Sequence, residues 1–311
     1  MRVIISRPVN YIERLDVAGD VRQFYDMLPE IITDMGYDCD IMCVYPGSKK
    51  ILREKDTLFL AWHLHGNKPD IWHLKTGYLP GYFYFDKYGY SGWAELAHKY
   101  EYHLDPDSIR DEMQVFCNNY IASNKSRALQ PKSAYIPNDP YVLVLQQRTN
   151  DYVMEFAHLD CQTLLDGVTE LYRDTKYTVC TKAHPLTNPN KDQRDRPLTI
   201  DPSVFEATGS IHKIIAGASA VYTVNSGSGF EALLHGKRVF TSGDCDYHWV
   251  TTSIKTKEEL QNSIHLIDQP VDKDKILLFL HYVLNEYFVN IYDERQIRHK
   301  ISRAISEYRA P

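Results

Sequence analysis

The sequence predicts an α/β protein built from two Rossmann-like halves. Short apolar runs alternate with longer segments of helical periodicity, a pattern typical of βαβ units with parallel sheets. The chain has 311 residues, about twice the length of a common domain of ~150 residues. A segment with three prolines and little periodicity, residues 126–140, separates two such series. We therefore expect two domains joined by this linker.

The first series contains four short apolar runs and two amphipathic segments. Gly36 is a natural stop for the first helix, and Asp105 with Pro106 is a typical opening for the second. The aromatic and glycine-rich residues 77–93 fit neither period, so we expect a loop with one short ribbon there. Strands are expected at residues 2–5, 40–44, 57–62 and 70–74, and helices at residues 21–35 and 105–124.

The second series continues the alternation to the end of the chain. Strands are expected at residues 141–145, 177–181, 220–224 and 238–241. Helices are expected at residues 159–173, 210–216, 229–234, 257–265, 273–290 and 293–308. The expected domains are residues 1–130, residues 131–290, and a C-terminal helix at residues 291–311 that packs back on the first domain.

Composition excludes several classes of protein. With 43% hydrophobic residues, the chain is neither disordered nor membrane-embedded, and no window approaches the ~20 apolar residues of a membrane span. The 35 basic and 41 acidic side chains argue against nucleic acid as a partner. Six scattered cysteines without a C-x-x-C pair indicate neither zinc nor disulfides. The start of the chain does not resemble a secretory signal, and we expect a cytoplasmic protein.

The small-residue turn after the strand at residues 220–224 is a candidate phosphate site. Open α/β sheets bind ligands beyond the carboxyl ends of their strands, and a helix that opens there presents free N–H groups and a positive dipole. The hydroxyls of Ser226 and Ser228 are extra donors beside Gly227, and Glu231 in the first helical turn can reach a ribose diol. The alternative is a plain strand–helix turn, since the glycine spacing is not that of a P-loop.

Two further strand ends carry basic residues. Lys182 and His184 lie two apart after the strand at residues 177–181, and Pro185 fixes the turn. Lys182 can neutralise a phosphate, and His184 can donate to it or to a leaving group. Arg148, after the strand at residues 141–145, is a candidate phosphate clamp. A solvated lysine, an incidental histidine and a surface salt bridge are the alternatives.

These segments resemble the capsule-polysaccharide biosynthesis family of bacterial glycosyltransferases, which includes Kdo-transferring enzymes. The similarity lies in Leu145-Gln146-Gln147, in Lys182-Ala183-His184-Pro185, and above all in residues 221–251 with their G-F-E-A-L-L helix start and G-K-x-V element. It covers roughly residues 141–252, in the family's order. The family usually has proline at the position of Ala183, and its tail differs at Asp244-Cys245-Asp246.

The resemblance implies a GT-B-like enzyme with two Rossmann-like domains facing a central cleft, the second of which binds a nucleotide-sugar donor. The two departures bear on the identity of the base and the sugar. Lys182 and His184 would contact the donor phosphate. The nucleotide pocket would be lined by Ser226, Gly227, Ser228 and Glu231, with Arg148 as a further donor-binding residue.

The acceptor side is less well marked. Residues 74–80 and 84–90 look like the family's G-F-L-R … D-x-x-G-x-Y region, which places Asp86 where a carboxylate can deprotonate an acceptor hydroxyl. The alternative is an ordinary aspartate in a turn, because Asp favours such turns. The rival bases are His63, His65 and Asp70.

Tyrosine is over-represented, and seven of the 23 tyrosines fall between Tyr78 and Tyr102. Sugar sites favour aromatic platforms, because C–H faces stack on rings and hydroxyls bind the sugar. Half-buried tyrosines on a ribbon are the alternative interpretation. The residues expected to bind the acceptor are Tyr78, Tyr84, Trp93 and His65.

Two tripeptides, residues 38–40 and 244–246, match the D-x-D signature of manganese-dependent glycosyltransferases. The first precedes a strand, away from the ligand edge, and helix dipole with basic side chains can replace a metal ion. We therefore expect a metal-independent glycosyltransferase with no cofactor besides its nucleotide-sugar donor, acting on a hydroxyl of a glycan acceptor, with Asp86 and His184 as catalytic residues. The alternatives are a nucleotide-sugar 2-epimerase of the same fold and a non-catalytic glycan-binding protein.

Overall fold

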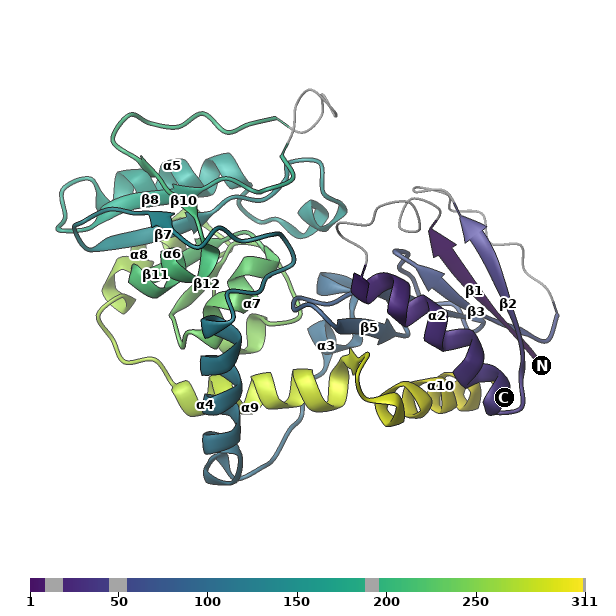
Figure 1. Ribbon diagram of the computed structural model, residues 1–311. Coiled ribbons are helices and arrows are strands. Elements are labelled where there is room, and N and C mark those ends of the chain that lie inside the picture. Colours follow the sequence, from purple (N-terminus) through teal and green to yellow (C-terminus); the bar gives the residue numbers. More distant parts are fainter. Residues whose placement is uncertain (9–18, 45–54, 188–195, 310–311) are drawn as a thin grey trace. The chain divides into compact units, whose positions relative to one another are not determined.

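The computed structural model describes residues 1–8, 19–44, 55–187 and 196–309, and it divides into two compact units (Figure 1). Unit 1 comprises Met1–Lys99 and Tyr282–Pro311, and unit 2 comprises Tyr100–His281. The divisions therefore fall after Lys99 and His281, and not at the expected boundaries after residues 130 and 290. The expected linker belongs wholly to unit 2.

Unit 1 is built on a six-stranded sheet of order β14-β5-β4-β3-β1-β2. The pairs β2–β1, β1–β3 and β3–β4 are parallel, whereas β4–β5 and β5–β14 are antiparallel. The loop with one short ribbon expected in residues 77–93 contains the strand β5, which joins the main sheet through a turn at Gly77. The bounds are β1 Arg2–Pro8, β2 Asp38–Val44, β3 Thr57–Trp62, β4 Ile71–Thr76, β5 Tyr82–Asp86 and β14 Val289–Asn290.

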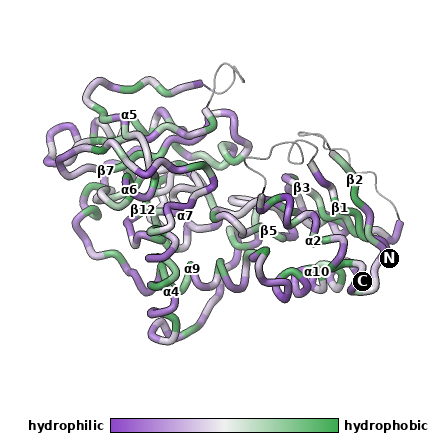
Figure 2. Tube along the Cα trace, in the orientation of Figure 1, coloured by the Kyte–Doolittle hydropathy of each residue, from purple (hydrophilic) through white to green (hydrophobic). Residues whose placement is uncertain are grey.

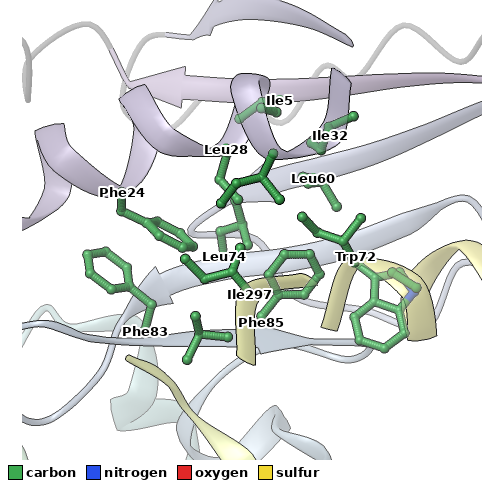
Figure 3. Close-up of a cluster of buried hydrophobic side chains, with 14 of the residues drawn as sticks. Ile5, Phe24, Leu28, Ile32, Leu60, Trp72, Leu74, Phe83, Phe85 and Ile297 are labelled. Carbon is green, nitrogen blue, oxygen red and sulfur yellow. The ribbon is translucent and has the colours of Figure 1, made fainter. Parts of the chain in front are cut away.

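Two helices, α2 (Gly19–Asp34) and α10 (Glu294–Arg309), share one hydrophobic core with this sheet. Figure 3 shows Phe24, Leu28 and Ile32 of α2 pointing into a cluster that also receives Ile297 of α10. Figure 2 shows that α10 is hydrophilic over much of its length, so only its core-facing stripe is apolar. The short segments of the unit are a 3₁₀ turn at Ser91–Trp93, α3 at Glu95–His98 and a π-helical turn at Val283–Tyr287.

Unit 2 is built on a second six-stranded sheet, of order β13-β12-β11-β7-β8-β9, in which every pairing is parallel. The central strand β7 spans the predicted residues, and its five side chains are all buried, as expected for a strand covered on both faces. The bounds are β7 Tyr141–Leu145, β8 Thr178–Lys182, β9 Phe205–Glu206, β11 Ala218–Thr223, β12 Val239–Thr241 and β13 Thr252–Ser253.

The helices of unit 2 begin at polar caps. The side chain of Asp105 caps α4, that of Asp160 caps α5 and that of Ser210 caps α6, each by accepting a backbone N–H. The expected helix at residues 273–290 ends earlier, at Tyr282, before the π-helical turn and β14 of unit 1. The bounds are α4 Pro106–Ala122, α5 Cys161–Tyr172, α6 Ile211–Gly217, α7 Gly227–Leu234, α8 Lys257–Asn262 and α9 Lys273–Tyr282.

The expected linker contains a short strand, β6 (Ala134–Tyr135), paired antiparallel with β10 (Thr208–Gly209). A side chain at Gly209 would place a Cβ 2.2 Å from the carbonyl oxygen of Ser133, so glycine is required for this close approach. In the part of the chain that the structure describes, no helix combines the length and hydrophobicity needed to cross a membrane.

Candidate functional site

The carboxyl ends of β11, β7 and β8 form one edge of the sheet of unit 2. Thr223 pairs with Leu145, and Leu145 pairs with Lys182, so these three strands end in register. The residues that follow them therefore gather at the edge where open α/β sheets bind ligands. The sequence placed Arg148, Lys182, His184 and the turn before α7 at this edge, and the strand register agrees with that placement.

The turn before α7 is held by hydrogen bonds within the protein. The Ser226 hydroxyl caps the helix by accepting from the Ser228 N–H at 3.4 Å, and the Tyr247 hydroxyl donates to the Ser226 carbonyl at 2.7 Å. A Cβ on Gly229 would lie 2.7 Å from the Tyr247 hydroxyl, so this glycine allows helix packing and not the approach of a ligand. The positive end of α7 begins at Gly227, which is half-buried.

Glu231 lies in the second turn of α7 and not in the first, because the helix begins at Gly227, two residues before the expected start at residue 229. Its side chain is buried, with 3% of the residue exposed, and it is hydrogen-bonded to the hydroxyls of Ser126 and Ser228. Its Oε1 atom has no hydrogen-bond partner. Burial raises the pKa of Glu231 to about 7, against the opposing effects of the two serines, Arg127 and Lys182. A buried acceptor without a donor from the protein can accept a hydrogen bond from a bound water or ligand.

Lys182 and His184 present donors at the same edge. Burial lowers the pKa of Lys182, whereas the nearby Glu231 carboxylate favours the ammonium form. His184 Nδ1 accepts the Leu186 N–H at 3.2 Å, which places the proton of a neutral imidazole on Nε2. The expected roles of Lys182 as a cation and His184 as a donor are both compatible with this geometry.

Two amides that the sequence analysis did not assign to the site lie beside it. Gln147 and Asn225 each follow their strand by two residues, at matched positions of β7 and β11. The Asn225 Nδ2 donates to the Val153 carbonyl at 2.8 Å, which fixes the direction of its oxygen. The side-chain oxygens of both amides are buried and lack hydrogen-bond partners. Their positions directly after strands were the available signal. Arg148 is half-buried in the turn after Gln147.

The D-x-D tripeptides are occupied by internal contacts. Asp244 is exposed and pairs with His158 Nε2 at 3.0 Å and with Lys255 Nζ at 3.8 Å. Asp246 is fully buried, and Asp40 on β2 pairs with Arg2. Among the residues that the structure describes, no three His, Cys, Asp or Glu side chains are grouped as metal ligands.

In unit 1, Asp86 is a buried anchor for the loop that follows β5. One carboxylate oxygen accepts the N–H groups of Tyr88 and Gly89, and the other accepts the Glu95 N–H and the Tyr287 hydroxyl. Burial raises the pKa of Asp86, and these four donors oppose that shift. With 2% of the residue exposed and both oxygens occupied, the geometry does not fit the expected general base.

The residues expected to form an aromatic platform fall into two groups, which differ in whether their ring faces are covered by protein. Tyr78 and Tyr84 are buried, and the ring of Tyr84 packs against Phe288 with centroids 4.7 Å apart, so their faces are covered by protein. Trp93 is half-buried and stacks on the exposed His65 with centroids 4.0 Å apart. The acceptor-binding role fits the geometry of His65 and Trp93 but not that of the two tyrosines.

The carboxyl ends of β3 and β4 bring two basic side chains together. Lys75 Nζ lies 2.7 Å from His63 Nε2 and 4.4 Å from the centroid of the Tyr90 ring. The φ of His63 is +56°, which is uncommon for a residue with a side chain and is typical of functional positions. Asp70 precedes β4, at the opposite edge, and so does not belong to this group. Lys75 was not among the site residues predicted from the sequence.

The comparison with protein families identifies the chain. The capsule polysaccharide biosynthesis protein family matches residues 74–284. The chain belongs to this family. No curated protein sequence matches it.

A solved structure shows the same fold. A structure described as Thermosulfurimonas dismutans KpsC, beta Kdo 2,4 transferase, is 16% identical with a TM-score of 0.56, over 97% of this chain and 98% of that chain. The beta Kdo 2,7 transferase of the same KpsC is 15% identical with a TM-score of 0.49, over 97% and 99% of the two chains. The predicted α/β class, with two Rossmann-like domains of the GT-B-like type, is confirmed.

Proposed function

We propose that this protein is a glycosyltransferase of polysaccharide synthesis that moves a sugar from a nucleotide-sugar donor to a hydroxyl of a glycan acceptor. Membership of the capsule polysaccharide biosynthesis family and the fold support this proposal. The observation that carries it is the buried Glu231, whose Oε1 lacks a partner beside Lys182 and the positive end of α7. A carboxylate oxygen next to cations suits a nucleotide, which carries ribose hydroxyls and phosphate together.

We call the edge of the unit 2 sheet formed by the carboxyl ends of β11, β7 and β8 the donor edge. It supplies the groups that stabilise the departure of the leaving group. Lys182 and the N-terminus of α7 stabilise the negative charge that develops on the donor phosphate, and His184 Nε2–H donates to it. Arg148 provides a further cation in the turn after β7. We assign the Glu231 Oε1 to a ribose hydroxyl. These residues stabilise the charge without a metal ion, as in the metal-independent reaction predicted from the sequence.

On the acceptor side, we assign sugar binding to Trp93 and His65. Because both oxygens of Asp86 are occupied, His65 is the titratable group that we propose as general base for the acceptor hydroxyl.

All six cysteines are free thiols, which supports a cytoplasmic site of action.

The test is incubation of the full chain with CMP-, UDP-, GDP- and dTDP-sugars and glycan acceptors, with analysis of nucleotide release and glycan products. We expect glycosyl transfer from one donor, lost in Lys182→Ala and retained in Lys213→Ala, whose side chain is exposed on α6. Absence of both turnover and thermal stabilisation with every one of these donors would overturn the proposal. Release of nucleotide with an epimerised sugar would select an epimerase. Glycan binding that survives both Lys182→Ala and His184→Ala, without nucleotide binding, would select a non-catalytic glycan-binding protein.

A further inference from the structure

The segment after α4, residues 124–135, begins with a turn at Asn124 and ends in β6, which pairs with β10. Asn124 has a φ of +53°, a left-handed conformation that asparagine tolerates better than most residues. At this residue the chain leaves the direction of α4 and continues toward α6. The sequence predicts a linker at residues 126–140, but the structure anchors residues 124, 125 and 130 by hydrogen bonds.

The anchors all lie at the start of α6. The Ser210 hydroxyl donates to Asn124 Oδ1 at 2.5 Å, and the Ile211 N–H donates to Gln130 Oε1 at 2.9 Å. The His212 Nε2 lies 2.7 Å from the Lys125 carbonyl oxygen, and burial lowers the pKa of this histidine. Neutral His212 therefore donates to that carbonyl. Residues 125 and 130 are fixed on either side of Ser126 and Arg127.

Between these anchors, Ser126 and Arg127 reach the donor edge. The Ser126 hydroxyl is hydrogen-bonded to the Glu231 carboxylate, and the positive charge of Arg127 stabilises the ionised form of the same carboxylate. Since Glu231 Oε1 has no hydrogen-bond partner, the serine hydroxyls hold the other oxygen. Ser126 thereby orients the carboxylate so that one oxygen remains for a ligand.

Two cations from separate segments act on this one carboxylate. Lys182 comes from the end of β8, and Arg127 comes from the segment after α4. Arg127 is exposed, so its guanidinium is accessible to a bound anion and can bind a phosphate in bidentate fashion.

We propose that Ser126 and Arg127 complete the donor site: Arg127 binds the phosphate of the nucleotide donor together with Lys182, and Ser126 positions Glu231 toward a ribose hydroxyl. This inference rests on the proposed function. It assigns a binding role to a segment that carries none of the family motifs quoted above.

The test is calorimetric titration of the full chain with CMP, UDP, GDP and dTDP. For the nucleotide that binds, Arg127→Ala should weaken affinity about 10- to 100-fold, as loss of a charge-assisted hydrogen bond does. Arg127→Lys should recover part of the loss. The matched control is Arg173→Ala, which removes an exposed arginine of the same unit that pairs with Glu170. Thermal unfolding verifies that each variant is folded.

The positioning role of Ser126 has its own measurement. A carboxyl-detected NMR titration should show a higher apparent pKa for Glu231 in Ser126→Ala than in the parent protein, with Ser126→Thr close to the parent. If nucleotide binds and the Arg127→Ala and Ser126→Ala variants behave like Arg173→Ala in both measurements, the inference is overturned and the proposed function stands. If no nucleotide binds the parent protein, the proposed function fails and the inference fails with it.

Discussion

The carboxylate of Asp86 accepts four hydrogen bonds and has no acceptor among its partners, which is the environment of an ionised structural carboxylate. Its partners lie in the loop after β5, at the start of α3 and in the π-helical turn at Tyr287. One side chain therefore joins three segments of unit 1. The sequence marked Asp86 as unusual but could not distinguish a base from an anchor, because Tyr287 is 201 residues away.

The substitution Asp86→Asn separates the two roles. It replaces one accepting oxygen with an NH₂ group that faces N–H or O–H donors, so we expect the free energy of unfolding to fall by about 2–4 kcal/mol. Thermal and urea denaturation measure the loss, with the exposed Asp34→Asn as control. If Asp86→Asn unfolds like the parent protein and abolishes only transfer, Asp86 is the base after all.

Glu231 makes stability depend on pH in a defined direction. Its pKa is about 7 in the folded chain and 4.5 in the unfolded reference, so the folded state holds the proton more tightly. Stability from this group is complete below pH 4.5 and is lost as the pH rises through 7. The difference corresponds to about 3 kcal/mol.

The variant Glu231→Gln removes this titration. We expect Glu231→Gln and the parent protein to have similar stability near pH 4.5 and the variant to be the more stable at pH 8. Urea denaturation at a series of pH values gives the free energy of unfolding of both proteins. The contributions of the other carboxylates cancel when one value is subtracted from the other. Parallel pH profiles for the two proteins would contradict the assignment of the titration to Glu231.

At the scale of elements, α7 is positioned by a close contact between its first turn and Tyr247. Gly229→Ala gains helix propensity, but its Cβ would lie 2.7 Å from the Tyr247 hydroxyl and 3.0 Å from Thr223 Cγ2. Overpacking of this kind costs about 1–3 kcal/mol and outweighs the gain of under ~1 kcal/mol from propensity. We expect Gly229→Ala to lower stability and nucleotide affinity together.

A double-mutant cycle with Tyr247→Phe tests the cause. Removing the hydroxyl makes room for the new methyl group, so the loss caused by Gly229→Ala should be smaller in the Tyr247→Phe background. Denaturation of the four proteins gives the interaction energy. Additive losses would show that the contact with Tyr247 does not determine the requirement for glycine.

The elements that the sequence predicted well are those whose signals are local. The capping residues Asp105 and Ser210 and the buried strand at Tyr141–Leu145 need only neighbouring residues to be recognised. The strand β5 was predicted only as a short ribbon within a loop, because an aromatic run has no clear period and its pairing with β4 depends on a tertiary contact. The segment at residues 124–135 was missed for the same reason, since its anchors lie at Ser210–His212.

At the scale of the whole molecule, unit 1 is discontinuous in sequence. Its core combines β-strands from the first 99 residues with the last 30, and the side chains of α10 complete the hydrophobic cluster of Figure 3. Sequence periodicity predicted the C-terminal helix, and the family motifs predicted which edge of the unit 2 sheet binds the donor. The boundaries between the units could not be deduced, because they depend on which contacts α10 and β14 make.

The pair Ile301→Asp and Ser302→Asp tests the contribution of α10 in the full chain. Ile301 is 1% exposed in the core of unit 1, whereas its neighbour Ser302 is exposed, so the two variants introduce the same charge at a buried and at an exposed position of one helix. Burying an unpaired carboxylate typically costs more than ~4 kcal/mol. Ile301→Asp should therefore unfold unit 1 at a markedly lower temperature, and Ser302→Asp should resemble the parent protein.

Because the proposed donor residues lie in unit 2, nucleotide binding should survive in both variants below the unfolding transition of that unit. Hydrogen exchange resolves the two units within one sample. Equal protection of β1, β3 and β4 in the two variants would show that α10 does not stabilise the sheet of unit 1.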